Sequence, residues 1–224
     1  DSVASRGLGD VYKRQSVIWA ADYLMNIGRI KRVLVLCPLS IMSPAWGGDL
    51  FKFAMHRSFA IAHSHSKQKR IDAINSDAEF VIINFDGLAV VKDEVAKANF
   101  DLIVVDEANA YKNVQTKRWK VLNSIIKPET WVWMLTGTPA AQSPTDAYGL
   151  AKIVSPKNVP RFFGEFRDKL MFKVSTFRWV QKPQASKLVH EALQPAIRFT
   201  KDECLDLPEM TYVMRDIPLT PQQE

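Results

Sequence analysis

The sequence has few cysteines and none of the spacings that mark a structural metal site. Its two cysteines, Cys37 and Cys204, form no Cys-x-x-Cys pair and are too few for a disulfide framework. His63 and His65 are close in sequence, but no cysteine lies near them, so we expect loop residues rather than zinc ligands. These absences exclude a disulfide-stapled fold and favour a reducing, intracellular setting without structural zinc.

Long apolar runs are also missing. None approaches the roughly 18 residues that a membrane-spanning helix needs, and the first residues lack the charged-then-apolar pattern of a secretory signal. We therefore expect a soluble protein that is not exported and has no membrane partner. With 224 residues, 47% of them hydrophobic, the chain can form one large α/β domain or two small ones.

Acidic residues are scarce between residues 157 and 201. This segment holds ten Lys and Arg residues against three acids, so its net charge of +7 exceeds the +6 of the whole chain. The interleaved aromatic residues are Phe162, Phe163, Phe166, Phe172, Phe177 and Trp179. This composition suits contact with a nucleic-acid backbone. The alternative is a core that buries the aromatics beneath a solvated basic face.

A complete phosphate-binding loop is missing as well. Such a loop supplies backbone N–H groups and a lysine to the phosphates, and a hydroxyl to Mg²⁺. Gly7 and Gly9 could end such a loop, but Asp10 and Val11 stand where the lysine and the hydroxyl residue are expected. Residues 1–15 are therefore interpreted as a degenerate loop remnant, or as a non-native string of the kind found at the ends of assembled environmental reads.

The most informative stretch that is present covers residues 100–108, FDLIVVDEA. Its four central apolar residues are typical of a parallel strand covered on both faces. Ligands bind beyond the carboxyl ends of such strands, where Asp106 and Glu107 stand. In a nucleotide hydrolase the first acid holds Mg²⁺ and the second orients or polarises the attacking water. The alternative is a strand followed by a solvated acidic turn.

Strands and helices alternate along residues 16–156, which predicts an α/β fold: an open, mainly parallel sheet with helices on both faces. Strands are expected near residues 32–40, 58–62, 80–83, 102–105 and 130–135. Helices are expected near residues 16–27, 46–53, 67–75, 116–126 and 147–154, with a further one ending near 98. The remaining residues, 157–224, are expected to be mainly helical, with no strand before 190 and extended segments near 196–200 and 211–217.

Five short motifs occur in a fixed order: residues 36–40 (LCPLS), 84–88 (NFDGL), 106–109 (DEAN), 112–113 (KN) and 135–139 (LTGTP). Together they resemble the first RecA-like lobe of superfamily 2 helicases, and within these the SNF2 family of DNA-translocating ATPases. The resemblance covers residues 16–224. It continues through Gln142, Pro144, Asp146, Tyr148, Leu150, residues 198–201 and residues 207–208.

The resemblance implies an enzyme that uses ATP and Mg²⁺ and moves along DNA. Asp106 would coordinate Mg²⁺ and Glu107 would activate water, while Thr136 and Thr138 would link the nucleotide state to DNA contact. The residues implied in nucleotide binding are Gly7, Gly9, Asp106, Glu107, Thr136, Gly137 and Thr138. Those implied in DNA contact are Pro38, Leu39, Ser40, Lys169, Lys173 and Arg178. Such backbone contacts carry no sequence code, so we expect sequence-independent binding of duplex DNA.

Some family features are absent from the sequence. Asn109 replaces the usual histidine of the acidic box, and Gln142 stands where the family often has asparagine. Nothing resembles the second lobe with its arginine fingers, so we expect a chain that is truncated at both ends and hydrolyses little ATP alone. Two other hypotheses stay open: a degenerate lobe that only binds DNA or a partner, and an unrelated doubly wound enzyme acting on a small phosphorylated substrate. The order of the motifs disfavours the last.

Overall fold

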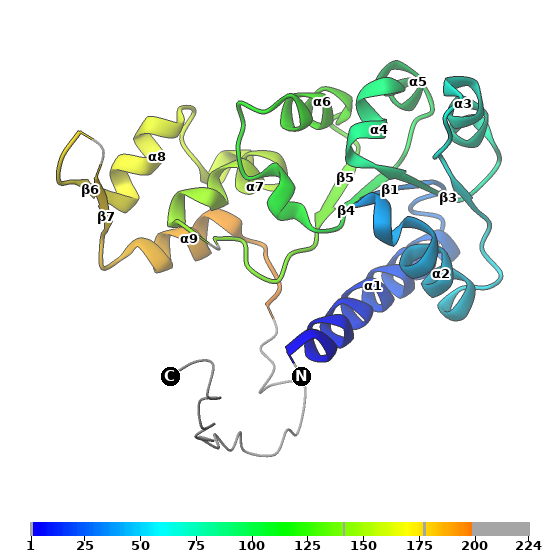
Figure 1. Cartoon of the computed structure of the whole chain (residues 1–224), viewed down its shortest axis with the longest axis horizontal. Helices are drawn as coiled ribbons and strands as arrows, with labels where there is room; N and C mark the ends of the chain where they lie inside the picture. The colour runs from blue at the N-terminus through cyan, green and yellow to red at the C-terminus, as the bar shows by residue number, and fades with distance from the viewer. Residues whose placement is uncertain (1, 141, 177, 199–224) are drawn as a thin grey trace, which may run out of the picture.

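A five-stranded sheet, all of whose strands are parallel, forms the centre of the molecule (Figure 1). The computed structural model describes residues 2–140, 142–176 and 178–198. The strands are β1 (Val33–Cys37), β2 (Phe59–Ile61), β3 (Phe80–Asn84), β4 (Leu102–Val105) and β5 (Trp131–Met134), in the spatial order β2-β3-β1-β4-β5. The predicted open parallel sheet is thus confirmed.

The three central strands are buried because their sequences are continuously apolar. Every residue of β1 and β4 is buried, whereas the edge strands β2 and β5 are partly exposed. In the register, Leu36 of β1 lies beside Ile83 of β3 and Val105 of β4. The carboxyl ends of these strands therefore meet at one edge of the sheet, where ligands bind in folds of this kind.

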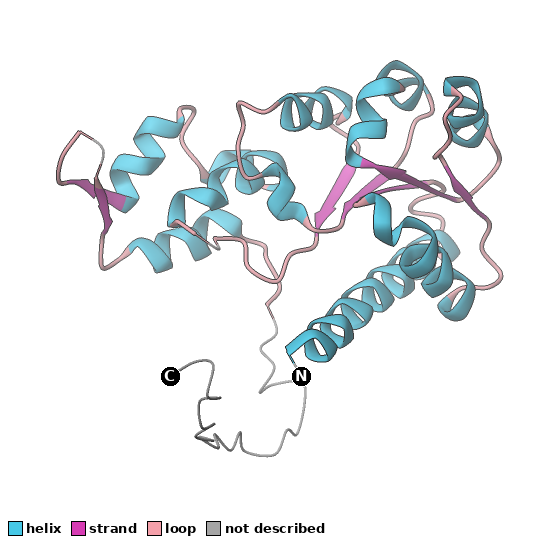
Figure 2. Ribbon diagram, viewed as in Figure 1, coloured by secondary structure: helices cyan, strands magenta, loops and turns pink. Residues whose placement is uncertain are grey.

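Helices cover both faces of the sheet (Figure 2), because alternate strand residues point to opposite sides. Val33, Val35 and Cys37 pack with helices α1 (Ser2–Asn26) and α2 (Gly48–Phe53) and the π-helix η2 (Met42–Gly47). Leu34 and Leu36 pack on the other side. The helices of that second face are α3 (Lys67–Asn75), α4 (Phe85–Val90), α5 (Lys92–Lys97), α6 (Lys117–Ile125) and α7 (Ala147–Val154).

A smaller unit follows α7 and has its own core. Helices α8 (Phe163–Leu170) and α9 (Ala185–Leu193) pack against α7 around Tyr148, Phe166 and Val189. An antiparallel hairpin, β6 (Met171–Lys173) with β7 (Trp179–Gln181), lies at the end of the molecule far from the sheet (Figure 1). The expectation of no strand before residue 190 is therefore wrong, because three-residue strands are too short to show an alternating pattern. The segments expected at 211–217 and at 199–200 lie outside the described residues.

Helix α1 is longer than predicted. It begins at Ser2 rather than near residue 16 and ends before Gly28, whose φ of 72° suits a glycine after a helix. Gly7 and Gly9 lie inside it, so the expected loop remnant is corrected to a helix whose N–H groups bond to carbonyls one turn earlier. Among the described residues, no helix is both long and apolar enough to cross a membrane.

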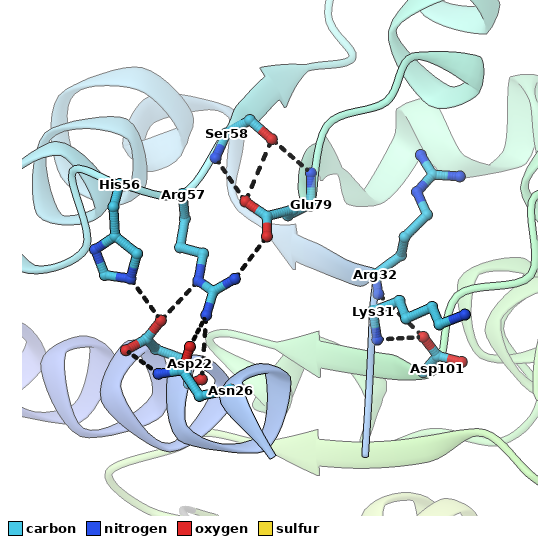
Figure 3. A network of polar contacts seen from close by, with 9 residues as sticks. All are labelled: Asp22, Asn26, Lys31, Arg32, His56, Arg57, Ser58, Glu79 and Asp101. Atoms are coloured by element: carbon cyan, nitrogen blue, oxygen red, sulfur yellow. Dashed lines mark hydrogen bonds and ion pairs between the residues drawn. The ribbon is translucent and has the colours of Figure 1, made fainter. Parts of the chain in front are cut away.

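Polar side chains join the segments at the amino edge of the sheet (Figure 3). Asp22 of α1 accepts hydrogen bonds from Arg57 Nε at 2.6 Å and pairs with His56 Nε2 at 2.8 Å. Arg57 Nη1 donates to Glu79 Oε1 at 2.7 Å, and Glu79 Oε2 accepts from the Ser58 N–H at 2.9 Å. The chain before β2 is thereby tied both to α1 and to the chain before β3.

Arg32 and Asp101 form a second tie at the same edge. Asp101 Oδ2 accepts the backbone N–H groups of Lys31 and Arg32 at 2.7 and 3.0 Å (Figure 3). The Arg32 guanidinium donates to four carbonyls near the ends of α3 and α5, those of Ile74, Ser76, Ala78 and Ala98. Carbonyls at helix ends lack partners within the helix, so this cation satisfies groups that would otherwise need water.

The carboxyl groups of Asp22 and Glu79 make the first tie dependent on pH. Burial raises the pKa of each, but hydrogen bonds from Arg57 and its neighbours outweigh it, so each pKa lies below its ordinary value. An acid whose pKa is lower in the folded state than in the unfolded state stabilises the protein at pH values above its unfolded-state pKa, which is about 4. This stabilisation is lost as the pH falls through the folded-state pKa.

Replacing both acids by amides, Asp22→Asn with Glu79→Gln, should lower the free energy of unfolding at neutral pH by about 1 to 2 kcal/mol. Because amides do not titrate, the variant should also lose less stability on acidification than the wild type. Urea-unfolding midpoints at neutral pH and at roughly pH 3.5 measure both effects. Asp72→Asn, at an exposed acid of α3, is the control and should behave as the wild type. A double variant with the wild-type acid response would contradict the assignment.

Candidate functional site

The acid pair lies at the carboxyl end of β4. Asp106 is only 2% exposed, and its backbone N–H donates to Leu36 O of β1 at 2.8 Å. Glu107 is partly buried and has the left-handed dihedrals φ 52° and ψ 50°, which non-glycine residues seldom adopt. After this turn the Ala108 N–H donates to Leu135 O at 2.9 Å, just past β5. Backbone bonds to both neighbouring strands therefore fix the position of the pair.

Two donors and a nearby cation surround the Asp106 carboxylate. Trp46 Nε1 donates to Oδ2 at 2.9 Å, and the Glu107 N–H donates to Oδ1 at 2.9 Å. Arg14 Nη1 lies 4.0 Å from Oδ2, while Arg14 Nε donates to Asp49 at 2.6 Å. Burial raises the pKa of Asp106, and these donors and the charge of Arg14 offset the rise only in part.

The carboxylate oxygens of Asp106 and Glu107 suit a hard cation such as Mg²⁺, which prefers oxygen ligands. No group of three or more metal-ligating side chains occurs in the described part of the chain. This does not argue against Mg²⁺, which commonly takes one or two protein carboxylates and receives its other ligands from water and phosphates. Arg14, however, is a buried cation beside Asp106 Oδ2 and would repel a divalent ion at that oxygen.

The turn after β5 lies next to the acid pair. Leu135 bonds to the β4 segment in both directions, because its N–H donates to Val105 O at 2.8 Å and its O accepts from Ala108. The turn then begins with Thr136, whose Oγ1 accepts the Thr138 N–H at 3.2 Å, and Gly137 between them is exposed. The structure thus brings the predicted residues 106–107 and 136–138 to the same edge of the sheet.

A lysine clasp fastens the chain that follows the acid pair to the start of α7. Lys112 Nζ donates to Gln142 Oε1 at 2.8 Å and to Asp146 Oδ2 at 3.3 Å. Gly149 of α7 lies against the backbone carbonyls of Tyr111 and Lys112. A Cβ added at Gly149 would be 2.4 Å from Tyr111 O and 2.3 Å from Lys112 O. Any side chain at this glycine would force the two segments apart.

The motif at residues 84–88, at the end of β3, packs against the segment that contains Tyr111. Phe85 meets the fully buried Tyr111 edge-on, with ring centroids 5.4 Å apart. Gly87 allows the close approach of Asn84, since an added Cβ would lie 2.4 Å from Asn84 Oδ1. The motif at residues 84–88 is therefore in direct contact with Tyr111, which lies between the acid pair and Lys112.

The residues expected to contact DNA fall into two separate groups. Pro38 ends β1 and caps the 3₁₀ turn η1 (Leu39–Ile41), in which Leu39 is 51% exposed and Ser40 is exposed. Lys169 of α8, Lys173 of β6 and Arg178 before β7 are all exposed around the hairpin. The hairpin lies at the far end of the long axis from β1 (Figure 1), so the two groups form separate surfaces.

Three residues near the acid pair were missed by the sequence interpretation: Arg14, Trp46 and Asp49. Trp46 belongs to η2, and 60 positions separate it from the carboxylate that it contacts. Trp46 is completely buried in the structure. The burial of a single tryptophan cannot be predicted from the sequence, so no sequence signal connects Trp46 with the site.

Comparison with known proteins finds similarity along most of the chain. The family profile of the SNF2-related domain matches residues 7–224. The SWI/SNF-related matrix-associated actin-dependent regulator of chromatin subfamily A-like protein 1 of Xenopus laevis is 32% identical over 167 residues, which cover 70% of this chain and 17% of that protein. The chain spans less than a fifth of the curated relatives of this kind, with 17%, 8% and 19% of three of them covered.

Two solved structures share the fold. The Sulfolobus solfataricus SWI2/SNF2 ATPase core in complex with dsDNA has 27% identity and a TM-score of 0.56, covering 67% of this chain and 30% of that one. The SWI2/SNF2 ATPase core domain of the same organism has 23% identity and a TM-score of 0.62, covering 86% and 38%. The resemblance found in the ordered motifs is confirmed: this chain belongs to the SNF2-related family of helicase-like ATPases.

Proposed function

We propose that this chain is the first, nucleotide-binding lobe of an ATP-dependent DNA translocase. The observation that carries the proposal is the placement of Asp106 and Glu107 at the carboxyl end of β4, bonded through Ala108 to the Leu135 carbonyl before the 136–138 turn. Two adjacent acids beyond a central parallel strand suit phosphoryl transfer, in which one carboxylate holds the metal and another group orients water.

Within this lobe the two acids would have different tasks. Asp106 would hold Mg²⁺, which when bound neutralises charge on the transferred phosphoryl group. The Trp46 and Glu107 N–H donors keep the Asp106 carboxylate in one orientation, and its burial excludes bulk water. Glu107 would orient the attacking water and accept its proton. Its left-handed backbone turns the chain immediately after Asp106.

The lysine clasp would connect this chemistry to the rest of the lobe. Lys112 joins the segment after the acid pair to Gln142 and Asp146, and α7 continues from there into the unit that carries the hairpin. Thr136 and Thr138 stand at the start of the same connection. A change at the nucleotide would therefore reach the unit that carries the hairpin through the packing of α7 against α8 and α9.

DNA contact is proposed for the basic surface around the hairpin and for the exposed η1 turn. Support comes from the exposure of Lys169, Lys173 and Arg178 and from the related Sulfolobus solfataricus core, whose structure is a complex with dsDNA. Cations that meet phosphates position the protein without reading bases. The contact would therefore be independent of DNA sequence.

A second candidate is a lobe that binds DNA or a partner without catalysis. Two observations favour it for the chain with this sequence: Gly7 and Gly9 are helical, and Arg14 lies 4.0 Å from the carboxylate that would hold the metal. ATP turnover by the intact enzyme, with a lysine-containing phosphate loop and a second lobe, separates the two candidates, because only a catalytic lobe supports it.

We expect the chain with this sequence to bind ATP poorly. The helical residues 7–9 do not form a loop around phosphates, the sequence has Asp10 where a phosphate-binding lysine is expected, and Arg14 opposes Mg²⁺ at Asp106. Titration of a fluorescent ATP analogue with Mg²⁺ measures the affinity. Binding in the micromolar range would contradict this expectation and would require another phosphate site.

In the intact enzyme, with a lysine-containing phosphate loop and a second lobe, substitutions of Glu107 and Asp106 should have different effects. Glu107→Gln should retain ATP binding but lower turnover by roughly 10² to 10⁴, the size of a lost general base. Asp106→Asn should weaken Mg²⁺-dependent nucleotide binding, because a charged oxygen ligand is removed. Steady-state turnover with DNA present and nucleotide titration distinguish these effects. Glu129→Gln, exposed before the amino end of β5, is the control, and wild-type turnover by Glu107→Gln would refute the role.

Duplex binding by the chain should be weak and sensitive to salt. If about four to six phosphates are neutralised, log affinity should fall against log salt with a slope of roughly −4 to −5. Replacing Lys169, Lys173 and Arg178 by Gln should reduce that slope by about 2 to 3 on unrelated sequences alike. The matched control removes three exposed lysines of α5 and α6: Lys97, Lys117 and Lys120. Equal losses in both triple variants would contradict a localised surface.

A further inference from the structure

A solvent-open cleft lies where α8 meets the β6–β7 hairpin, away from the acid pair. Its volume is about 540 Å³, and its lining includes Arg167 and Asp168 of α8 and Met171, Lys173 and Trp179 of the hairpin. A hairpin that met DNA phosphates only through exposed lysines would not need such a concavity.

One wall of the cleft is a stacked pair of planar groups. The guanidinium carbon of Arg167 lies 3.9 Å from the centroid of the Trp179 ring. Arg167 Nε and Nη2 both donate to Asp168 Oδ1, at 3.1 and 3.0 Å, which fixes the plane of the guanidinium. Unpaired bases stack on aromatic rings and on arginine planes.

A second cation stands beside this pair. Lys173 lies directly opposite Trp179 in the hairpin register, so both side chains project from the same face. Residues 157–182 hold seven Lys and Arg residues against two acids, and one of those acids, Asp168, is already paired with Arg167. The chemistry that complements the cleft is therefore an anionic ligand with a flat aromatic group.

We propose that this cleft takes an unpaired nucleotide of a DNA strand, with its base stacked against the Arg167–Trp179 pair and its phosphates facing Lys173. The inference rests on the proposed DNA contact of the same unit and narrows its substrate to duplex DNA that carries a single-stranded extension. The phosphates of a blunt duplex satisfy the cations but offer no free base for the stacked pair.

The test compares three labelled DNAs with the complete chain by fluorescence anisotropy at low salt: a blunt duplex, the same duplex with an oligo-dT overhang, and oligo-dT alone. The overhang should raise affinity over the blunt duplex by roughly 5- to 150-fold, the effect of one stacked base. Trp179→Leu should abolish this gain and leave blunt-duplex affinity unchanged. Phe162→Leu is the matched control, because Phe162 is also an aromatic residue next to an arginine but does not line the cleft. Phe162 is 61% exposed, and its ring centroid lies 5.4 Å from the guanidinium carbon of Arg161.

Several results would overturn the inference. If the blunt duplex binds with the expected salt dependence but the overhang adds nothing, the inference fails while the proposed DNA contact stands. If none of the DNAs binds, both fail. Equal effects of Trp179→Leu and Phe162→Leu would show that the stacked pair has no special part. Displacement of the overhang DNA by polyglutamate at lower concentration than by oligo-dT would assign the cleft to an acidic peptide.

A second measurement avoids substitution of the hairpin. Overhang DNA that carries iodouracil in its single strand is irradiated with the unsubstituted chain, and the crosslinked peptides are identified by mass spectrometry. A crosslink at Trp179 is the expected result, because a stacked base lies within van der Waals distance of the ring. Crosslinks confined to other residues would overturn the inference even if Trp179→Leu proves unstable.

Discussion

The parallel register between β1 and β4 is the constraint on which the rest of the site depends. Leu36 accepts the Asp106 N–H, and on the other side Leu135 accepts the Ala108 N–H, so the sheet hydrogen bonds continue past the last residue of β4. Between these two bonds Glu107 adopts its left-handed turn. Backbone hydrogen bonds to both neighbouring strands thus position the acid pair, and each of these strands contributes its own motif at the same edge.

Burial of Asp106 sets the electrostatics of that edge. A carboxylate removed from water is costly unless donors or cations compensate it. Here Trp46, the Glu107 N–H and the charge of Arg14 do so, although the pKa of the acid remains raised. Arg14 comes from α1, so the charge balance of the acid pair depends on the very segment whose sequence departs from a phosphate-binding loop.

Much of the fold was predictable because its signals are local. The bounds of α3 and α7 agree with the predicted residues 67–75 and 147–154, since Ser66 caps the first helix and a proline, Pro144, precedes the second. The strands at residues 80–83 and 102–105 were predicted from unbroken apolar runs. The helix expected at residues 46–53 instead begins as the π-helix η2 at Met42, and the hairpin went unpredicted, because neither has a periodicity that a short sequence window can show.

The sequence by itself determined the alternation of strands and helices and the position of Asp106 and Glu107 at the end of a buried strand. Apolar runs, helical periodicity and turn residues are patterns of a few neighbouring positions, so they can be recognised without a structure. Only the tertiary structure decided that Trp46 donates to Asp106, that Lys112 reaches Gln142, and that Arg167 stacks on Trp179. Those pairings depend on strand order and on how the helices cross the sheet, which bring together side chains that no local pattern connects.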